Sequence, residues 1–474
     1  MNNIKEIIEQ SGIKFGTSGA RGLVVDFTAN VCTAFTLSFL DAMKKSFDFK
    51  RVAVAIDNRP SSPQISETVC TTIKAYGYEV DFYGVLPTPA LALQAMRDTI
   101  PSIMITGSHI PFDRNGIKFY TPDGEISKND EVDILNNTNS MIDVNSKIPQ
   151  IKDTATNTYL NRYKNYFGAN CLNALKIGIY EHSSAGRDIY AELFTTLGAE
   201  VILLGRSDQF VPIDTEAVSP EDKAKGKHWS SEYKFDLIFS TDGDGDRPLI
   251  ADENGEWLRG DIVGLLTAQL LEIEALAVPV SCNTAIEKSN SFKEVLRTKI
   301  GSPYVIEAFE ELKNYNSFAG FEANGGFLLG STLEQNGNIL ESLPTRDALL
   351  PFIVLASHIV EEKTTLSKLT QNLPQRFTSS DRIQEFPRES SLKLIEQGLS
   401  NPDALIKQFE LEDAKVIDIN QIDGLRLTLS SSVIVHLRPS GNAPELRCYV
   451  ETDNQTTSDE LVKQVLSSIT EITL

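Results

Sequence analysis

Short apolar runs alternate with helix-like segments along most of this chain, and this alternation limits the folds that it can adopt. Between residues 51 and 105, runs rich in Val, Ile and Ala predict strands at 51–56, 79–83 and 102–105. The segments between these strands predict helices at 62–75 and 87–97. Strands separated by single helices form βαβ units, so the pattern predicts a largely parallel sheet.

The same alternation recurs further along the chain and then gives way to a different pattern. It predicts strands at 175–180, 200–204, 237–240, 278–282 and 317–320, with helices at 186–197 and 260–272. Closely spaced strands follow at 416–419, 425–429, 432–437 and 446–451, before a final helix at 458–472. We therefore predict three similar α/β domains with mixed, mainly parallel sheets over 1–150, 151–255 and 256–375, and an α+β domain over 376–474.

Size and composition are those of a globular protein. The chain has 474 residues, 41% of them apolar, which is enough for several hydrophobic cores. Its net charge of −21 repels nucleic acids and anionic lipids, so we expect neither a nucleic acid nor a membrane as a partner. The five scattered cysteines form no C-x-x-C pair, and no long apolar segment is present, so we expect a cytoplasmic protein without disulfides or a zinc module.

Four polar, glycine-rich loops stand out, and each falls in a different predicted domain. The first is Thr106-Gly-Ser-His-Ile-Pro111, directly after a predicted strand. Ser108 would lie at the carboxyl end of a parallel sheet, where ligands usually bind, although a solvated turn is the alternative. The nucleophile elbow of serine hydrolases does not fit, because Ile110 and Pro111 follow the histidine.

The second loop, Ser240-Thr-Asp-Gly-Asp-Gly-Asp-Arg247, carries carboxylates at alternate positions. Asp242, Asp244 and Asp246 can converge on one hard cation, because the intervening glycines let the chain curl around it. An EF-hand does not fit, because Arg247 stands where that loop requires glycine. A phosphate-handling Mg²⁺ site fits better than an acidic turn, in which unneutralised carboxylates would repel one another.

The remaining two loops favour ligand binding. In Gly320-Phe-Glu-Ala-Asn-Gly-Gly326, the single acid Glu322 suits sugar hydroxyls, with a plain β-turn as an equal alternative. The last loop is Arg438-Pro-Ser-Gly-Asn-Ala-Pro-Glu-Leu-Arg447, in which two arginines flank Ser440, Gly441 and Asn442. Guanidinium groups, a hydroxyl and backbone N–H groups can meet one phosphate dianion, so we favour a phosphate site over a solvated loop.

Taken together in this order, the loops resemble those of the α-D-phosphohexomutase superfamily. Residues 106–111 match its phosphoserine loop T-[AG]-S-H-N-P, and residues 242–247 match its metal loop D-G-D-[GA]-D-R. Residues 320–326 match the sugar loop G-E-x-S-G-H loosely, and residues 438–444 match the phosphate loop R-[PA]-S-[GN]-T-E-P. The segment Phe15-Gly-Thr-Ser-Gly-Ala-Arg-Gly22 also resembles the family motif F-G-T-[SD]-G-x-R-G.

The resemblance implies a heart-shaped enzyme of four domains around a central cleft. It implies that Ser108 carries a phosphoryl group, and that Ser108, Asp242, Asp244 and Asp246 hold Mg²⁺ against it. Such an enzyme interconverts hexose 1-phosphate and hexose 6-phosphate, of mannose, glucose or both, through a bound hexose 1,6-bisphosphate. Positioning and neutralised charge, which this site would supply, are what phosphoryl transfer requires.

The family positions imply roles for further residues. Lys118 is expected to transfer protons, Arg21 beside it to stabilise charge, and His109 to assist at the phosphoserine. The substrate, a small sugar phosphate, is expected to meet Arg247, Glu322, Asn324, Arg438, Ser440, Gly441, Asn442 and Arg447. The chain itself is expected to be a monomer or a dimer.

Three positions depart from the family pattern. Ile110 replaces an asparagine, Gly326 stands where many members have histidine, and Asn442-Ala443 replaces Thr-Glu. These departures leave the hexose unassigned and keep phosphoglucosamine mutase as an alternative function. A phosphoserine-dependent sugar phosphatase and a catalytically silent sugar-phosphate-binding protein are further alternatives. The phosphate loop argues against the phosphatase, and the intact Ser108 and aspartates argue against the silent protein.

Overall fold

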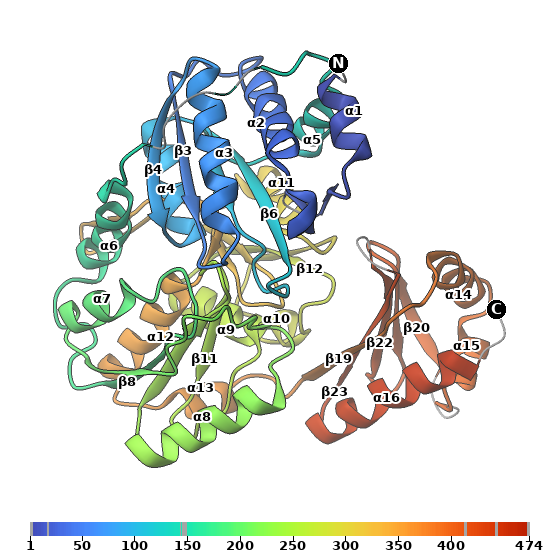
Figure 1. Cartoon of the computed structure of the whole chain (residues 1–474). Helices are drawn as coiled ribbons and strands as arrows, with labels where there is room; N and C mark the ends of the chain where they lie inside the picture. Colours follow the sequence, from blue (N-terminus) through green and yellow to red (C-terminus); the bar gives the residue numbers. More distant parts are fainter. Residues whose placement is uncertain are drawn as a thin grey trace.

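Four large sheets, each in its own part of the chain, form the framework of the molecule. The computed structural model describes residues 3–16, 19–142, 144, 149–411, 415–440 and 444–471, and in these residues three α/β units precede an α+β unit. Figure 1 shows the α+β unit, in brown and red, to one side of the other three. The predicted fold class of mixed α/β sheets with a C-terminal α+β part is confirmed.

The first sheet has the strand order β1-β2-β6-β5-β3-β4, with β7 attached to β6. Strands β4, β3 and β5 pair in parallel, and the other pairs are antiparallel. Its elements are α1 Ile4–Gln10, β1 Lys14–Phe15, β2 Ala20–Leu23, the 3-10 helix Val24–Asp26, α2 Ala29–Met43, β3 Arg51–Ile56, α3 Ser62–Ala75, β4 Glu79–Val85, α4 Thr88–Asp98, β5 Ser102–Ile105, β6 Arg114–Thr121, β7 Gly124–Glu125 and α5 Lys128–Leu135.

The second sheet, β11-β10-β8-β9, and the third, β13-β12-β14-β15-β18, repeat this arrangement of three parallel strands extended by antiparallel ones. The elements of the second unit are α6 Thr154–Phe167, β8 Lys176–Tyr180, α7 Tyr190–Thr196, β9 Glu200–Leu204, α8 Pro220–Tyr233, β10 Leu237–Thr241 and β11 Pro248–Ala251. Those of the third are α9 Gly260–Leu270, β12 Ala275–Pro279, α10 Ala285–Lys288, β13 Glu294–Thr298, α11 Ser302–Leu312, β14 Phe318–Phe321, β15 Phe327–Leu329, the small sheet of β16 Leu333–Gln335 with β17 Asn338–Leu340, β18 Leu343–Asp347, α12 Leu349–Glu362 and α13 Leu366–Gln371.

The fourth sheet, β19-β23-β22-β21-β20, is antiparallel throughout. The helices of this unit pack on the sheet around a core that includes Leu394, Phe409 and Val465. The elements are β19 Phe377–Ile383, α14 Arg388–Ser400, α15 Pro402–Gln408, β20 Val416–Asn420, β21 Leu425–Leu429, β22 Ile434–Pro439, β23 Leu446–Thr452 and α16 Gln455–Glu471.

One hydrophobic core runs through the first three units, whereas the C-terminal unit has a core of its own. In the shared core, Phe352 of α12 lies 4.7 Å from Phe194 of α7 and 4.6 Å from Phe239 of β10, measured between ring centroids. The connection to the C-terminal unit is polar instead. There, the Thr284 N–H donates a 3.0 Å hydrogen bond to the buried Glu451, and Nδ2 of Asn283 donates a 2.9 Å hydrogen bond to Thr378.

Most predicted elements lie within three residues of their observed bounds, and the two largest departures have a structural reason. The strand predicted at 278–282 is β12 at Ala275–Pro279, because the chain turns after Pro279, where Cys282 donates its N–H to the Pro279 carbonyl. Cys282 is buried in this turn, so its apolar character reflects burial and not strand structure. The helix predicted at 186–197 begins only at Tyr190, because the preceding loop is tied to the loop between β10 and β11 by the Ala185–Gly243 backbone hydrogen bond.

No helix in the described ranges is both long and apolar enough to cross a membrane. All five cysteines are free.

Candidate active site

The four predicted loops occupy equivalent places in the four sheets. They connect β5 to β6, β10 to β11, β14 to β15 and β22 to β23. In the first three sheets, the earlier strand belongs to the parallel group and the later strand returns antiparallel beside it. Each of these three loops therefore leaves the carboxyl end of a parallel strand, the edge of an α/β sheet at which ligands bind.

Ser108 is held in a conformation that serine rarely adopts. It is buried, and its φ of 54° lies in the left-handed region. Its N–H donates to Oγ1 of Thr106 at 2.8 Å, and that hydroxyl donates to Oδ2 of Asp57 at 2.8 Å. Such strained residues persist where the surroundings fix them, and they concentrate at functional sites.

Arg59, which the sequence analysis missed, holds the Ser108 loop through hydrogen bonds to its backbone. Its guanidinium donates to the carbonyl oxygens of Ser108 at 2.8 Å and of Pro111 at 2.7 Å. A Cβ at Gly107 would lie 2.6 Å from Cζ of Arg59, so glycine is needed at that position. The available signal was the position of Arg59 in a polar turn directly after strand β3.

The Ser108 loop contacts the Asp242–Asp246 loop directly. Oγ of Ser108 donates to Oδ2 of Asp242 at 2.7 Å. A Cβ at Gly243 would approach the Ser108 carbonyl oxygen to 2.6 Å, so glycine allows the two loops to come this close. The residues predicted to carry the phosphoryl group and to bind metal are therefore neighbours.

The three aspartates converge as a metal site requires. Each of Asp242, Asp244 and Asp246 offers one carboxylate oxygen, and these oxygens lie within 4.8 Å of one another. Oδ1 of Asp244 and Oδ1 of Asp246 are buried without a hydrogen-bond partner in the described chain. Buried, unpaired carboxylate oxygens beside a serine hydroxyl form a donor set suited to a hard divalent cation, so the residues fit Mg²⁺.

The electrostatics of the aspartates also favour a cation. Burial, followed by the charges of Asp244 and Asp246, raises the pKa of Asp242 well above its usual range. Burial raises the pKa of Asp246 as well, but the charges of Arg346 and Lys118 outweigh it and hold that pKa below its usual value. A positive charge among the three carboxylates would relieve their repulsion.

Lys118 lies beside the aspartates. It stands on β6 opposite Met104 of β5, and its Nζ lies 2.6 Å from Oδ2 of Asp244 and 2.9 Å from Oδ2 of Asp246. We expected Arg21 to be the charged neighbour of Lys118, but these contacts are with carboxylates. The ammonium group binds the Oδ2 atoms, whereas the Oδ1 atoms of the same two carboxylates have no hydrogen-bond partner in the described chain.

Arg247 contacts His109 and carries its charge close to Arg21. Its Nη1 donates to Nδ1 of His109 at 2.9 Å, and Oγ of Ser108 lies 3.4 Å from the same nitrogen. Burial and then the charge of Arg247 lower the pKa of His109 to about 3, so the imidazole is neutral at physiological pH. Burial and then Arg247 also lower the pKa of Arg21 to about 10, which still leaves Arg21 charged near neutral pH.

The sugar loop is a tight turn that presents Glu322. Gly325 has a φ of 89°, and Oδ1 of Asn324 accepts the N–H of Gly326 at 3.0 Å. The Asn324 carbonyl accepts from Thr215 of the second unit at 2.7 Å. Asn324 thus uses its carbonyl groups to shape the loop.

Arg346 joins the sugar loop to the metal loop, and the sequence analysis missed it too. Its Nε donates to Oδ2 of Asp246 at 3.0 Å, and its Nη1 donates to Oε2 of Glu322 at 3.1 Å. The signal in the sequence was an Arg-Asp pair directly before the apolar stretch that forms α12. Through Arg346, one network of polar contacts extends from Ser108 to Glu322.

The fourth loop is not part of this network among the described residues. Nε of Arg438 donates at 2.9 Å to Asp423 of its own unit, whose carboxylate also accepts the Ile300 N–H of the third unit at 3.0 Å. Arg447 stands opposite Arg438 in the β22–β23 pair, and the Ser440 N–H donates to the Glu445 carbonyl at 2.8 Å. Gly441 and Asn442 lie outside the described residues.

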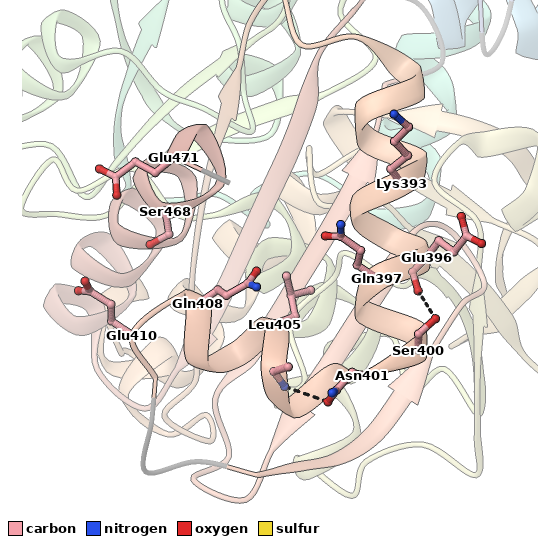
Figure 2. A pocket seen from close by; sticks show the side chains of 11 residues that line it. Lys393, Glu396, Gln397, Ser400, Asn401, Leu405, Gln408, Glu410, Ser468 and Glu471 are labelled. Atoms are coloured by element: carbon pink, nitrogen blue, oxygen red, sulfur yellow. Dashed lines mark hydrogen bonds between the residues drawn. The ribbon is translucent and has the colours of Figure 1, made fainter. Parts of the chain in front are cut away.

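A large surface hollow lies elsewhere. Figure 2 shows this pocket of about 830 Å³ on the C-terminal unit, lined by side chains of α14, α15 and α16 such as Lys393, Gln397 and Leu405. The described residues that line it include none of those predicted for the chemistry. The convergence of the loops, and not the size of a hollow, therefore identifies the candidate active site.

Family models match most of the chain. The model described as phosphoglucomutase/phosphomannomutase, alpha/beta/alpha domain I, matches residues 12–143, and the model for alpha/beta/alpha domain III matches residues 259–377. The model for the phosphoglucomutase/phosphomannomutase C-terminal domain matches residues 380–468.

Individual proteins match over nearly the full length. The chain is 52% identical to a phosphomannomutase of Salmonella muenchen over 98% of each chain. It is 41% identical to a phosphomannomutase of Sinorhizobium fredii over 96% of this chain and 98% of the relative. Its fold is similar to that of a putative phosphomannomutase from Thermus thermophilus, with a TM-score of 0.76, 17% identity and coverage of 97% and 99%.

Proposed function

This chain belongs to the phosphoglucomutase/phosphomannomutase family of the α-D-phosphohexomutase superfamily, and from that premise we propose how its residues carry out the reaction. The enzyme is a phosphohexomutase, an isomerase that moves a phosphoryl group within a hexose phosphate. Our assignment of the active site rests on one observation above all. The buried Ser108 hydroxyl lies 2.7 Å from Asp242, at the edge of the acidic triad.

We propose that Ser108 carries the phosphoryl group in the active form. In the first half-reaction, the bond between phosphorus and the serine oxygen breaks, phosphorus bonds to O6 of a hexose 1-phosphate, and the proton of O6 passes to the serine oxygen. The resulting 1,6-bisphosphate reverses its orientation in the cleft. The phosphoryl group on O1 then returns to Ser108, and hexose 6-phosphate is released. Both steps require in-line positioning and neutralised charge.

Asp242, Asp244, Asp246 and Ser108 would hold Mg²⁺, which would neutralise charge on the transferring phosphoryl group when bound. The residues of the chain prepare this site. Lys118 bonds Oδ2 of Asp244 and of Asp246, and Arg346 bonds Oδ2 of Asp246, while Oδ1 of Asp244 and Oδ1 of Asp246 have no hydrogen-bond partner in the described chain.

Around Ser108, Lys118 is the proposed proton carrier. Arg21 and Arg247 supply positive charge for the phosphoryl oxygens. His109, which is neutral and accepts a hydrogen bond from Arg247, is proposed to keep that guanidinium oriented. We therefore propose a supporting role for His109 at the phosphoserine.

Two loops are proposed to bind the rest of the substrate. Glu322 and Asn324 would bind hydroxyls of the hexose. The phosphate that is not reacting would bind the fourth loop, through Arg438, Ser440, Gly441, Asn442 and Arg447. Closure of the C-terminal unit about the connection near residue 375 would bring this loop to the cleft and give the heart-shaped form.

The substrate class is tested with coupled assays of mannose, glucose and glucosamine 1-phosphates in the presence of Mg²⁺ and glucose 1,6-bisphosphate. We expect turnover of mannose 1-phosphate first, because the relatives at 52% and 41% identity are phosphomannomutases. Turnover of glucosamine 1-phosphate alone would favour phosphoglucosamine mutase. Release of inorganic phosphate without isomerisation would favour the phosphatase.

Three wider features complete the proposal. We propose domain boundaries near residues 150, 255 and 375, because each of the four ranges then contains one large sheet. We propose a cytoplasmic location, which the free thiols support. We propose a monomer or dimer that acts on a small sugar phosphate, with hexose 1,6-bisphosphate as its activator.

A further inference from the structure

Arg346 contacts both the metal loop and the sugar loop of the candidate active site. It lies at the end of β18 with its side chain almost fully buried. Its Nε is bonded to Asp246 of the metal loop, and its Nη1 is bonded to Glu322 of the sugar loop and, at 3.0 Å, to Oγ of Ser302. The guanidinium therefore stands between the residues proposed for the metal and those proposed for the hexose.

Gly326 provides the space that Arg346 occupies. A Cβ at position 326 would lie 2.5 Å from Cγ and 2.6 Å from Cδ of Arg346. These atoms are near the root of the arginine side chain and cannot move aside easily. A larger residue at position 326 and arginine at position 346 therefore exclude each other in this arrangement.

One nitrogen of Arg346 remains without a partner. Nη2 is buried, and it makes no hydrogen bond within the described chain. In a planar guanidinium, the protons of Nη2 lie on the two edges that it shares with Nε and with Nη1. Nε bonds Asp246, and Nη1 bonds Glu322 and Ser302, so Nη2 lies next to the groups that bind both carboxylates. An unpaired buried donor is costly, which suggests that a ligand satisfies it.

We propose that Arg346 is a substrate-binding residue, whose Nη2 donates a hydrogen bond to a ring hydroxyl of the hexose that itself donates to Glu322. This inference rests on the proposed function and deepens it. A hydroxyl can accept from a guanidinium and donate to a carboxylate at the same time, so the Arg346–Glu322 pair can recognise a single hydroxyl by both of its hydrogen-bonding capacities. Loss of either partner leaves a buried polar group unpaired, which makes this contact selective.

The experiment measures the coupling between Arg346 and each ring hydroxyl. Wild type, Arg346→Met and Arg346→Lys are assayed with hexose 1-phosphate and with its monodeoxy derivatives, one for each ring hydroxyl. In wild type, removal of the contacted hydroxyl is expected to lower kcat/KM tenfold or more. In Arg346→Met, the same deletion is expected to have less than a threefold effect, because the contact is already lost. Arg346→Lys, which keeps one donor and the charge, should lie between them.

A surface arginine serves as the matched control. Arg97 is paired with the exposed Glu341, so Arg97→Met should show the wild-type response to every deoxy substrate. Equal deoxy effects in wild type and in both Arg346 variants would overturn the inference. If near-UV circular dichroism shows that Arg346→Met is unfolded, Gly326→Ala is used in its place, because it displaces the arginine but keeps its charge. Equal deoxy effects in wild type and in Gly326→Ala would then overturn the inference.

Failure of the inference is distinguishable from failure of the proposed function. Wild-type protein that isomerises no hexose 1-phosphate would overturn the proposed function. Wild-type turnover without coupling at Arg346 would overturn only this inference. Mn²⁺ binding by electron paramagnetic resonance, measured without substrate, separates a further role: if Arg346→Met weakened Mn²⁺ binding but left all deoxy effects at the wild-type level, Arg346 would only position Asp246.

Discussion

Thr88 holds Asp244 by two hydrogen bonds. Its Oγ1 donates to Oδ2 of Asp244 at 2.7 Å, and its N–H donates to the Asp244 carbonyl at 2.9 Å. Thr88 begins α4 of the first unit, whereas Asp244 belongs to the metal loop of the second. The contact thus crosses between two sheets to orient one proposed metal ligand.

Thr88→Val removes the side-chain bond while keeping the shape and the backbone bond. We expect divalent metal affinity to fall about tenfold, at the lower end of the roughly 10–100-fold effects seen when an outer partner of a metal ligand is removed. Mn²⁺ titration followed by electron paramagnetic resonance measures this affinity. Thr88→Ser keeps the hydroxyl and should bind like wild type. Unchanged affinity in Thr88→Val would show that Thr88 does not orient Asp244.

Ser108→Ala is expected to lower mutase turnover by on the order of 10³-fold or more, because no residue would then carry the phosphoryl group. The variant keeps its Cβ in the left-handed conformation and loses one hydrogen bond, so we expect a stability loss of only about 1 kcal/mol. Intact mass spectrometry after incubation with glucose 1,6-bisphosphate should detect a phosphorylated wild type and an unmodified variant. Near-normal turnover in Ser108→Ala would refute covalent transfer through this residue.

Arg438→Ala is expected to raise KM for hexose 1-phosphate roughly 10- to 100-fold, since a charge-assisted contact of about 1.5–3 kcal/mol is removed. More free 1,6-bisphosphate should also appear per turnover, because a weaker phosphate holder lets the intermediate leave before it reverses. Chromatographic quantification of the bisphosphate measures this escape. Arg382→Ala, an exposed arginine of the same sheet, is the control. If KM and escape both stay at wild-type values, the fourth loop is structural.

His436 predicts a defined pH dependence of stability. It is buried in β22, with Nε2 2.6 Å from the Asp423 carbonyl, and burial lowers its pKa to about 4. The unfolded state, with a histidine pKa near 6.5, binds the proton first as the pH falls. The contribution of neutral, buried His436 to the free energy of unfolding is therefore fully present above about pH 6.5, and it is lost progressively as the pH falls to about 4.

The His436→Gln variant isolates this effect. The difference in free energy of unfolding between wild type and variant should change by about 1.4 kcal/mol per pH unit between pH 6 and 4.5, in favour of the variant at lower pH. Urea unfolding at a series of pH values measures the difference. A difference that is independent of pH would mean that His436 is not held neutral in the folded protein.

The sequence predicts local features of this fold well and contacts across the chain poorly. The runs at 51–56 and 102–105 are strands as predicted, because β-branched residues between polar turns report a local preference. The strand predicted at 278–282 is observed three residues earlier, because Cys282 is buried in a turn and not in a strand. The core shared by three units was also hidden, since an apolar face does not reveal which helix will pack on it.

The same distinction applies to the site. Ser108 and the three aspartates lie in compact loops whose composition is unusual by itself. Arg59 and Arg346 act through partners that are distant in sequence: Arg59 braces a loop about 50 residues away, and Arg346 lies 100 residues from Asp246. A single arginine in an ordinary segment gives no local indication of such partners. Lys118 was identified, but its carboxylate neighbours could be known only from the fold.

The uninterrupted core of the first three units has a mechanical consequence. Relative motion of those units would open this core to water, for example where Phe352 of the third unit packs on Phe194 and Phe239 of the second, so they form a stiff frame. The polar junction, where Asn283 and Thr284 bond Thr378 and Glu451, carries no such cost, because water can replace its hydrogen bonds one by one. We therefore expect motion between units at the connection to the C-terminal unit, and little motion among the first three.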